Sequence, residues 1–241
     1  MTSPEVAGTK TPSVWEDFLD IFYAPSQVFA RRENGKFGLQ LTIIIVATMI
    51  LYYATYSVLS PIYEAMAARQ MEEVMRQNPQ ITEEQLRQGQ GIQRIIGGVV
   101  IAAVTGISVL LVGLMLWLSG KLFDSQATLR SMLVVATYSY VPRVLEWVVF
   151  AVQGALMDAS QLTNLTQLSL GPSRFMDPAT TSPLVLTLAF RFSVFFLWAT
   201  ILLAIGLKVT GKISMAKAAA AAFIVWLLGA IPMYFQFMQA R

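Results

Sequence analysis

The sequence predicts an all-α fold: a polytopic membrane bundle of five transmembrane helices, with an N-terminal interfacial amphipathic helix and an extramembrane helical hairpin. Hydrophobic residues make up 56% of the 241 residues and charged residues only 13%, whereas a soluble domain carries about 25% charged residues. Five apolar stretches are each long enough to cross a bilayer, for which about 20 residues are needed. Composition and span length therefore both indicate an integral membrane protein.

Composition also limits the function. The chain has no Cys and no His, so the thiolate nucleophile, the usual general base and the commonest metal ligands are missing. We therefore expect a protein that is not an enzyme and that binds no metal or cofactor. The net charge is only +3, and the Lys and Arg residues form no long basic patch, so we expect no nucleic-acid partner.

The N-terminal region divides into two parts. Residues 1–12 are expected to be disordered, and residues 13–36 to form an amphipathic segment that Pro25 interrupts. Its apolar residues recur at helical spacing with acidic residues opposite: Val14, Trp15, Phe18, Leu19 and Phe22 against Glu16, Asp17 and Asp20. Such a helix either lies in the membrane interface or packs as a soluble helix on the ends of the spans, and the sequence favours neither.

The membrane domain is expected over residues 37–241. Its predicted spans are about 37–59, 95–118, 131–156, 184–207 and 216–238. Residues 62–94 are polar and helix-prone, and Pro79 divides them in two. We therefore expect the extramembrane helical hairpin between the first two spans.

Small residues form a stripe along the second span. They are Gly98, Ala102, Gly106 and Gly113, at spacings of 4, 4 and 7 residues. Because small side chains at helical spacing let a second helix approach closely, helix packing is favoured over a pore lining.

Lys and Arg residues in the short loops predict the orientation. They precede the first span and lie in the links between spans two and three and between spans four and five: Arg31, Arg32 and Lys36; Lys121 and Arg130; Lys208, Lys212 and Lys217. With five spans, all three segments lie on one side. Because positive loops favour the cytoplasm, we expect a cytoplasmic N-terminus and a C-terminus outside or in a lumen.

Charged residues and prolines interrupt the apolar spans. Arg143 and Glu146 lie in the third span and Arg191 in the fourth, while Pro142 and Pro232 predict kinks in spans three and five. A charge at mid-membrane depth costs several kcal/mol unless it is paired or wet. We expect Glu146 to pair with Arg143 or Arg191, and carbonyls freed at Pro142, or water, to satisfy the other arginine. The cluster is either a polar site for an ion or lipid headgroup, or a structural ion pair.

A weak internal repeat relates the second and third spans to the fourth and fifth. Ser119-Gly120-Lys121-Leu122 precedes Val141-Pro142, as Thr210-Gly211-Lys212-Ile213 precedes Ile231-Pro232. Two parallel helical hairpins with similar kinks would fit this pattern, and so would chance.

Four stretches carry a resemblance to a known family: DIFYAPSQVFARR at 20–32, the hairpin segment NPQITEEQLRQ, LWLSGKLFDSQATLRSMLVVATYSYVPRVLEWV at 116–148, and LLAIGLKVTGKISMAKAAAA at 202–221. Together they resemble the Yip family, the Ypt/Rab-interacting-protein domain of five-span membrane proteins. The resemblance covers most of the chain after residue 14 and is greatest to bacterial members. It implies a cytoplasmic N-terminus, five spans and no known catalysis.

The resemblance also bears on partners. Eukaryotic relatives act in traffic between the endoplasmic reticulum and the Golgi, with Rab-type GTPases as partners. Their Asp-Leu-Tyr-Gly-Pro motif has only a loose counterpart in Asp20-Ile-Phe-Tyr-Ala-Pro25, and this departure argues against a GTPase partner here.

The resulting hypothesis is a non-enzymatic, Yip-type scaffold or accessory subunit in membrane organisation or transport, in the inner membrane of a bacterium. Its expected partners are the lipid bilayer and other membrane proteins of unknown identity. The alternative is a small channel or transporter with a polar intramembrane site at Arg143, Glu146 and Arg191. A water path past these residues would favour the alternative, and a dry, fully paired cluster would favour the scaffold.

Overall fold

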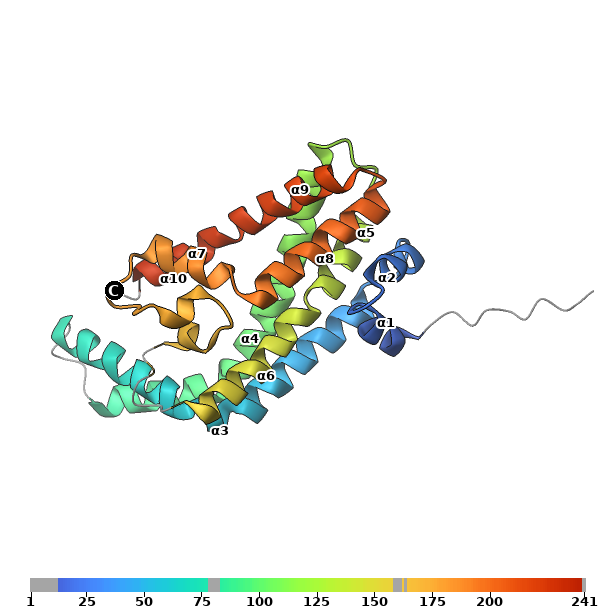
Figure 1. The fold of residues 1–241 in the computed structure, drawn as a ribbon. Helices are drawn as coiled ribbons and strands as arrows, with labels where there is room; N and C mark the ends of the chain where they lie inside the picture. Colours follow the sequence, from blue (N-terminus) through green and yellow to red (C-terminus); the bar gives the residue numbers. More distant parts are fainter. Residues whose placement is uncertain (1–12, 78–82, 158–161, 163, 240–241) are drawn as a thin grey trace, which may run out of the picture.

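The computed structural model describes residues 13–239 apart from 78–82, 158–161 and 163. The elements in chain order are α1 (Val14–Asp20), α2 (Pro25–Arg32), α3 (Gly38–Gln77), α4 (Glu83–Lys121), α5 (Leu129–Ser139), α6 (Val141–Leu156), the short 3-10 helices η2 (Leu165–Leu168) and η3 (Pro172–Phe175), α7 (Pro183–Arg191), α8 (Val194–Gly211), α9 (Met215–Leu228) and α10 (Ala230–Gln239) (Figure 1). The described residues contain no strand. The expectations for residues 1–12 and for Pro79 lie outside the described residues.

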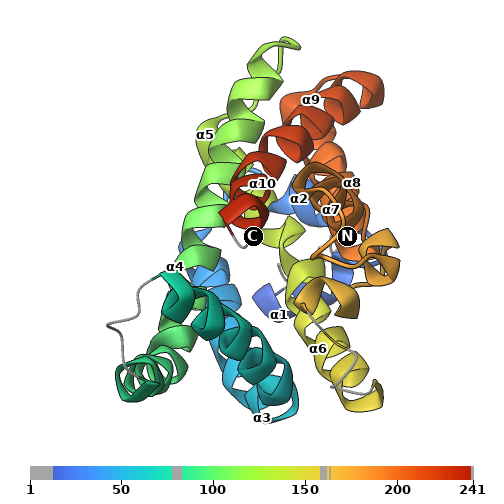
Figure 2. The ribbon, with the colours of Figure 1, turned by 90° about the vertical axis from the view of Figure 1, so that its left-hand side faces the viewer.

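Five helical segments are long and apolar enough to cross a membrane, which confirms the predicted fold class. They are Gly38–Glu64, Ile95–Lys121, Leu129–Leu156, Val194–Gly211 and Met215–Gln239. Figure 2 shows α3 and α4 on one side of the bundle and α8 and α9 on the other. Helix α5 packs on both α4 and α8, and α6 packs on both α3 and α8, so these two helices join the sides.

The fourth span differs from its predicted bounds of 184–207. Helix α7 ends at Arg191, and the apolar helix that follows begins at Val194. The break lies at Ser193, whose backbone is extended and whose side chain accepts a hydrogen bond from the Phe196 amide. A serine in this conformation caps a new helix, so the apolar run from Leu184 onward contains two helices.

The polar segment between the first two spans is not separated from them. Helix α3 continues through Pro61 to Gln77, and α4 begins at Glu83 and runs without a break to Lys121. The two extensions project beyond the rest of the bundle (Figure 1). They therefore continue the spans themselves.

Spans three and five are each divided close to a proline. Helix α5 gives way to α6 at Tyr140, which places Pro142 in the first turn of α6. A proline is well tolerated there, because the missing N–H would have no intrahelical partner. Helix α9 gives way to α10 at Gly229, three residues before Pro232.

The α4–α5 link and the α8–α9 link contact each other directly. The Gln126 amide donates to the Gly211 carbonyl at 3.0 Å, and a Cβ atom on Gly211 would lie 2.3 Å from Ser125 Oγ. Asp124 and Lys212 both have positive φ, 62° and 53°. Both links therefore turn through a left-handed residue, although the proposed repeat aligns Lys212 with Lys121 and not with Asp124.

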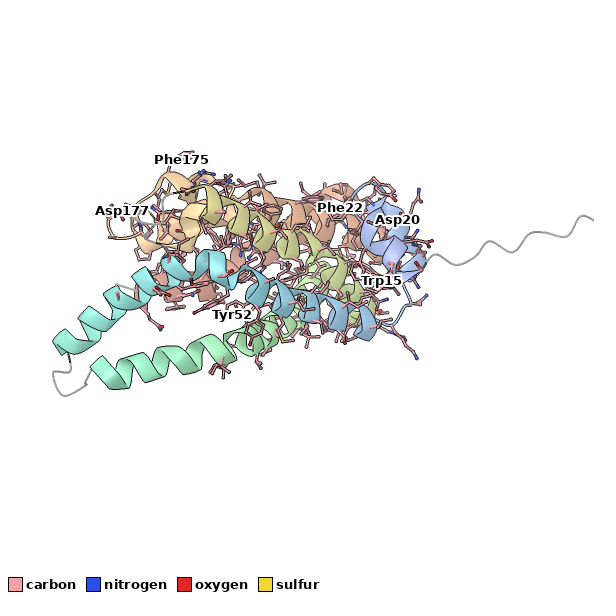
Figure 3. All side chains as sticks on the ribbon, turned by 90° about the horizontal axis from the view of Figure 1, so that it is seen from below. Trp15, Asp20, Phe22, Tyr52, Phe175 and Asp177 are labelled. Atoms are coloured by element: carbon pink, nitrogen blue, oxygen red, sulfur yellow. The ribbon has the colours of Figure 1, made fainter. Side chains whose placement is uncertain are left out.

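The basic segments gather at one end of the molecule. Both of these links lie at the end that carries α1 and α2 (Figure 1), and Arg130 Nε donates to the Gly35 carbonyl at 3.1 Å. Figure 3 shows Trp15, Asp20 and Phe22 at this end and Phe175 and Asp177 at the opposite end.

Two apolar cores hold the bundle. The larger core joins α2, α4, α5, α8 and α9 and includes Phe29, Leu116, Met132, Tyr138, Leu207 and Ala221. The smaller core lies at the end opposite to α2 and contains Leu59, Ile62, Phe150, Leu162, Leu168 and Phe190. The two cores fix the positions of α6, α7 and α8, which carry the charged residues.

Candidate functional site

Glu146 lies at the centre of the intramembrane charged cluster. Its side chain is only 4% exposed and forms an ion pair with Arg143, one turn earlier on α6. The Ser193 hydroxyl donates to the other carboxylate oxygen at 3.3 Å. Because Ser193 also begins α8, the carboxylate holds α6 against the break between α7 and α8.

Arg191 ends α7 and is 6% exposed. Its guanidinium carbon lies 4.9 Å from the centre of the Phe196 ring and 5.1 Å from that of Trp226. No ion pair joins it to a carboxylate of the described residues, and its Nε is buried without a hydrogen-bond acceptor among them. Of the two candidate partners for Glu146, the structure pairs Arg143. Arg191 is therefore the second arginine, for which a carbonyl or water contact was expected. Its Nε donates to no carbonyl of the described residues.

A cavity of about 410 Å³ lies beside the two arginines. Arg143 and Arg191 line it together, and the Phe196 ring is close to both, with its centre 3.6 Å from the Arg143 guanidinium carbon and 4.9 Å from that of Arg191. The remaining walls come mostly from apolar residues of α4, α8, α9 and α10. The charged cluster is therefore paired on the Glu146 side and open to a cavity on the Arg191 side.

The small-residue stripe of α4 faces other helices. Gly98, Ala102, Gly106 and Gly113 are all buried. A Cβ atom on Gly98 would lie 2.2 Å from the Tyr53 ring of α3, and one on Gly113 would lie 3.1 Å from the Cα atom of Leu133 in α5. The stripe therefore lies where α4 approaches α3 and α5 most closely.

A second charged cluster holds the N-terminal helices to the bundle. Asp17 is fully buried, and its carboxylate accepts hydrogen bonds from Arg31 Nε and Arg32 Nε, each at 2.6 Å. The Tyr138 hydroxyl of α5 also donates to it, at 2.8 Å. We call Asp17, Arg31, Arg32 and Tyr138 the Asp17 cluster.

The sequence predicts Asp17 on the polar face of an amphipathic helix, opposite the apolar residues, and the structure buries this carboxylate instead of leaving it in water. Asp17 points into the protein, while Trp15 and Leu19 on the expected apolar face are 67% and 64% exposed. Three donors converge on the carboxylate and compensate for its loss of water. The adjacent Arg31 and Arg32 could have indicated an acidic partner. No pattern in the surrounding sequence connects them to Tyr138.

Asp20 extends the Asp17 cluster toward solvent. The Tyr23 hydroxyl donates to its carboxylate at 2.6 Å. This hydrogen bond, together with one from Arg31, lowers the pKa of Asp20 below its ordinary value. The same contact with Asp20 raises the pKa of Tyr23.

Five apolar helices and a largely apolar exterior define the class: a polytopic α-helical integral membrane protein. The Yip1 domain family model matches residues 19–235, which is nearly the whole chain. The chain belongs to the Yip1 domain family, as the resemblance predicted. No curated protein and no solved structure matches the chain.

Proposed function

We propose that this Yip1-domain protein is a non-enzymatic scaffold or accessory subunit in membrane organisation or transport. We place it in the inner membrane of a bacterium, with its N-terminus in the cytoplasm, because the basic segments gather at the end that carries α1 and α2. The observation that carries the proposal is the buried Asp17 cluster. It fastens α1 and α2 to the membrane bundle at a defined position.

The docked helices present an apolar surface. Trp15, Leu19 and Tyr23 are large, mainly apolar side chains, and they are 67%, 64% and 74% exposed. Exposed aromatic residues are typical of contacts with membranes and with other proteins. We therefore assign this surface to the lipid interface and to another membrane protein. A GTPase partner is not proposed, because the Asp20–Pro25 segment departs from the family motif.

Photo-crosslinking in cells tests the scaffold proposal. A crosslinking residue at Leu19 should give a discrete protein adduct, and Asp17→Asn should abolish it by releasing the helix. The matched control is Phe175, which is 87% exposed at the opposite end and should give no adduct of the same size. Adducts with lipid alone at Leu19 would contradict the scaffold role.

The cavity favours a second candidate, a small channel or transporter that uses Arg143, Glu146 and Arg191. A scaffold needs no cavity of about 410 Å³ beside a buried cation, whereas a transport site does. Vesicles containing the purified protein should then show anion flux that falls with Arg191→Gln. Flux equal to that of protein-free vesicles would reject this candidate and leave the scaffold proposal intact.

A further inference from the structure

We propose that the cavity beside Arg191 binds a phosphate-bearing anion, with Arg191 as its main charged contact and Arg143 as the second. This proposal takes from the channel or transporter candidate only the location of the polar site. It adds the class of ligand that the site binds. Binding can occur whether or not the protein transports the ligand. The proposal follows from the charge of the cavity, from the placement of Arg191 and from the composition of the walls.

The cavity holds an excess of positive charge. Arg143 and Arg191 both line it, and the Glu146 carboxylate is engaged by Arg143 and Ser193. No carboxylate of the described residues forms an ion pair with Arg191. A buried cation without a counter-ion is costly in a bilayer, so the site favours an anion.

Arg191 has free hydrogen-bonding capacity. The Phe196 and Trp226 rings lie near its guanidinium and stabilise the cation through their faces. Rings do not replace the in-plane acceptors that the five N–H donors of a guanidinium require. The buried Nε lacks such an acceptor within the described structure.

The chain leaves room at this guanidinium. Gly229 lies between α9 and α10, and a Cβ atom there would come within 3.2 Å of a terminal nitrogen of Arg191. The absence of a side chain on Gly229 leaves room for the Arg191 guanidinium at the wall of the cavity. Planar, paired donors fit the oxygens of a phosphate well.

The walls indicate that the phosphate belongs to a lipid. Val104 and Leu111 of α4 line the cavity and are also 55% and 46% exposed on the outer surface. The cavity is therefore continuous with a surface that faces hydrocarbon. Ser108, Thr200 and Gln236 add polar atoms among apolar walls, a composition that suits a headgroup with an attached acyl chain.

The test measures how ligands raise the thermal unfolding midpoint of the full-length protein in mild detergent, since a ligand that binds only the native state stabilises it by an amount that grows with the ratio of ligand concentration to Kd. The ligands are dihexanoyl phosphatidylglycerol, the phosphate-free dihexanoylglycerol, inorganic phosphate, and chloride at equal ionic strength. The phosphatidylglycerol should bind, and dihexanoylglycerol and chloride should not. Arg191→Gln should weaken binding by about tenfold or more, as expected for one lost charge-assisted contact.

Two further variants separate charge from specific contact. Arg191→Lys keeps the charge and should bind more tightly than Arg191→Gln. Lys208→Gln removes one exposed positive charge from α8 and should leave binding unchanged. Equal weakening by Lys208→Gln would show attraction to net charge alone and would overturn the site.

A cavity-filling variant covers the case in which Arg191→Gln does not fold. Ala199→Phe adds a ring to the cavity wall without changing a charge, and it should abolish binding of phosphatidylglycerol in a folded protein. Inorganic phosphate bound as tightly as phosphatidylglycerol, with the same dependence on Arg191, would support the site and assign it to free phosphate. Binding of no phosphate compound, or binding unaffected by either variant, would overturn the proposal.

Discussion

The Glu146 carboxylate has two donors of different kinds. Arg143 supplies charge from the same helix, and Ser193 supplies a hydroxyl from the break before α8. Both oxygens are therefore engaged in a side chain that is almost fully buried. Removing the negative charge leaves the partly buried Arg143 guanidinium, whose side chain is 21% exposed, without its partner, which costs more than an exposed ion pair contributes.

Glu146→Gln should lower the free energy of unfolding by about 3 kcal/mol. Adding Arg143→Gln should restore part of that loss, because the stranded charge is then removed as well. The measurement is chemical unfolding in detergent, completed as a double-mutant cycle.

Lys217→Gln is the control for this cycle. Its ion pair with Asp124 is exposed, with an N–O distance of 3.2 Å, so the change should cost less than about 1 kcal/mol. Additive losses for Glu146→Gln and Arg143→Gln would show that the buried pair is not coupled.

Asp17→Asn should loosen α1 and α2. The neutral side chain still accepts a hydrogen bond but no longer balances Arg31 and Arg32, which we expect to cost about 2 kcal/mol. A spin label at Ser26→Cys, which is exposed on α2, should become more mobile. Asp20→Asn should have a smaller effect, because Arg31 then keeps its contact with Asp17. Equal mobility in both variants would contradict the central role of Asp17.

Mild acidification should not release the helices. The contact with Tyr23 lowers the pKa of Asp20, so its contribution to stability is present above the unfolded-state pKa of about 3.9 and is lost only as the pH falls through the lower native value. The mobility of the Ser26→Cys label should therefore be the same at pH 7 and at about pH 5. A rise in mobility over this interval that is absent from Asp20→Asn would show that Asp20 becomes protonated earlier.

The two charged clusters were not equally predictable. Arg143 and Glu146 share one helix face because they are three residues apart, so their proximity follows from helical geometry. Asp17 meets Arg31 and Arg32 only after the chain reverses between α1 and α2. Its contact with Tyr138 depends on the docking of both helices on α5, which no local pattern specifies.

The contacts of α4 depend on how closely its neighbours approach. A Cβ atom on Gly106 would meet the end of the Ile45 side chain at 3.0 Å, whereas one on Gly113 would meet the Leu133 Cα atom at 3.1 Å and the Met132 carbonyl at 3.3 Å. A side-chain end can rotate away. A backbone atom moves only with its helix.

Gly113→Ala should therefore destabilise the protein more than Gly106→Ala does. Overpacking a close contact costs about 1–3 kcal/mol, and we expect Gly113→Ala to reach this range and Gly106→Ala to stay below it. Gly106→Leu, with a longer side chain, should separate α4 from α3. The thermal unfolding midpoints of the three variants in detergent test this order, and an unchanged midpoint for Gly113→Ala would contradict the close packing of α4 on α5.

The sequence predicted five apolar helical segments, which the structure contains, but it did not reveal the break at Ser193 between α7 and α8. Hydropathy does not reveal a break within an apolar run, and Leu184–Leu207 is such a run. Ser193 was the local signal, since serine favours a helix N-cap. The signal is weak alone, because a serine inside a membrane helix can bond to its own backbone instead.

For the molecule as a whole, the orientation can be measured without a background signal, because the chain contains no Cys. Gln126 and Asp177 are both exposed and lie toward opposite ends of the bundle. In intact cells an impermeant thiol reagent should label Asp177→Cys, and it should label Gln126→Cys only after permeabilisation. Ser3→Cys should behave like Gln126→Cys, and Ala240→Cys like Asp177→Cys. The reverse pattern would contradict a cytoplasmic N-terminus.

The length of α3 has a mechanical consequence. Its 40 residues follow a path of about 60 Å, roughly twice the thickness of the hydrocarbon core, and the helix bends partway along its length (Figures 1 and 3). Because the span and its extension are one helix, a tilt of about 5° around the bilayer centre would move the far tip by about 3 Å. A force applied at that tip is transmitted through the continuous helix to the span. Any partner that binds the projecting helices would therefore move together with the bundle.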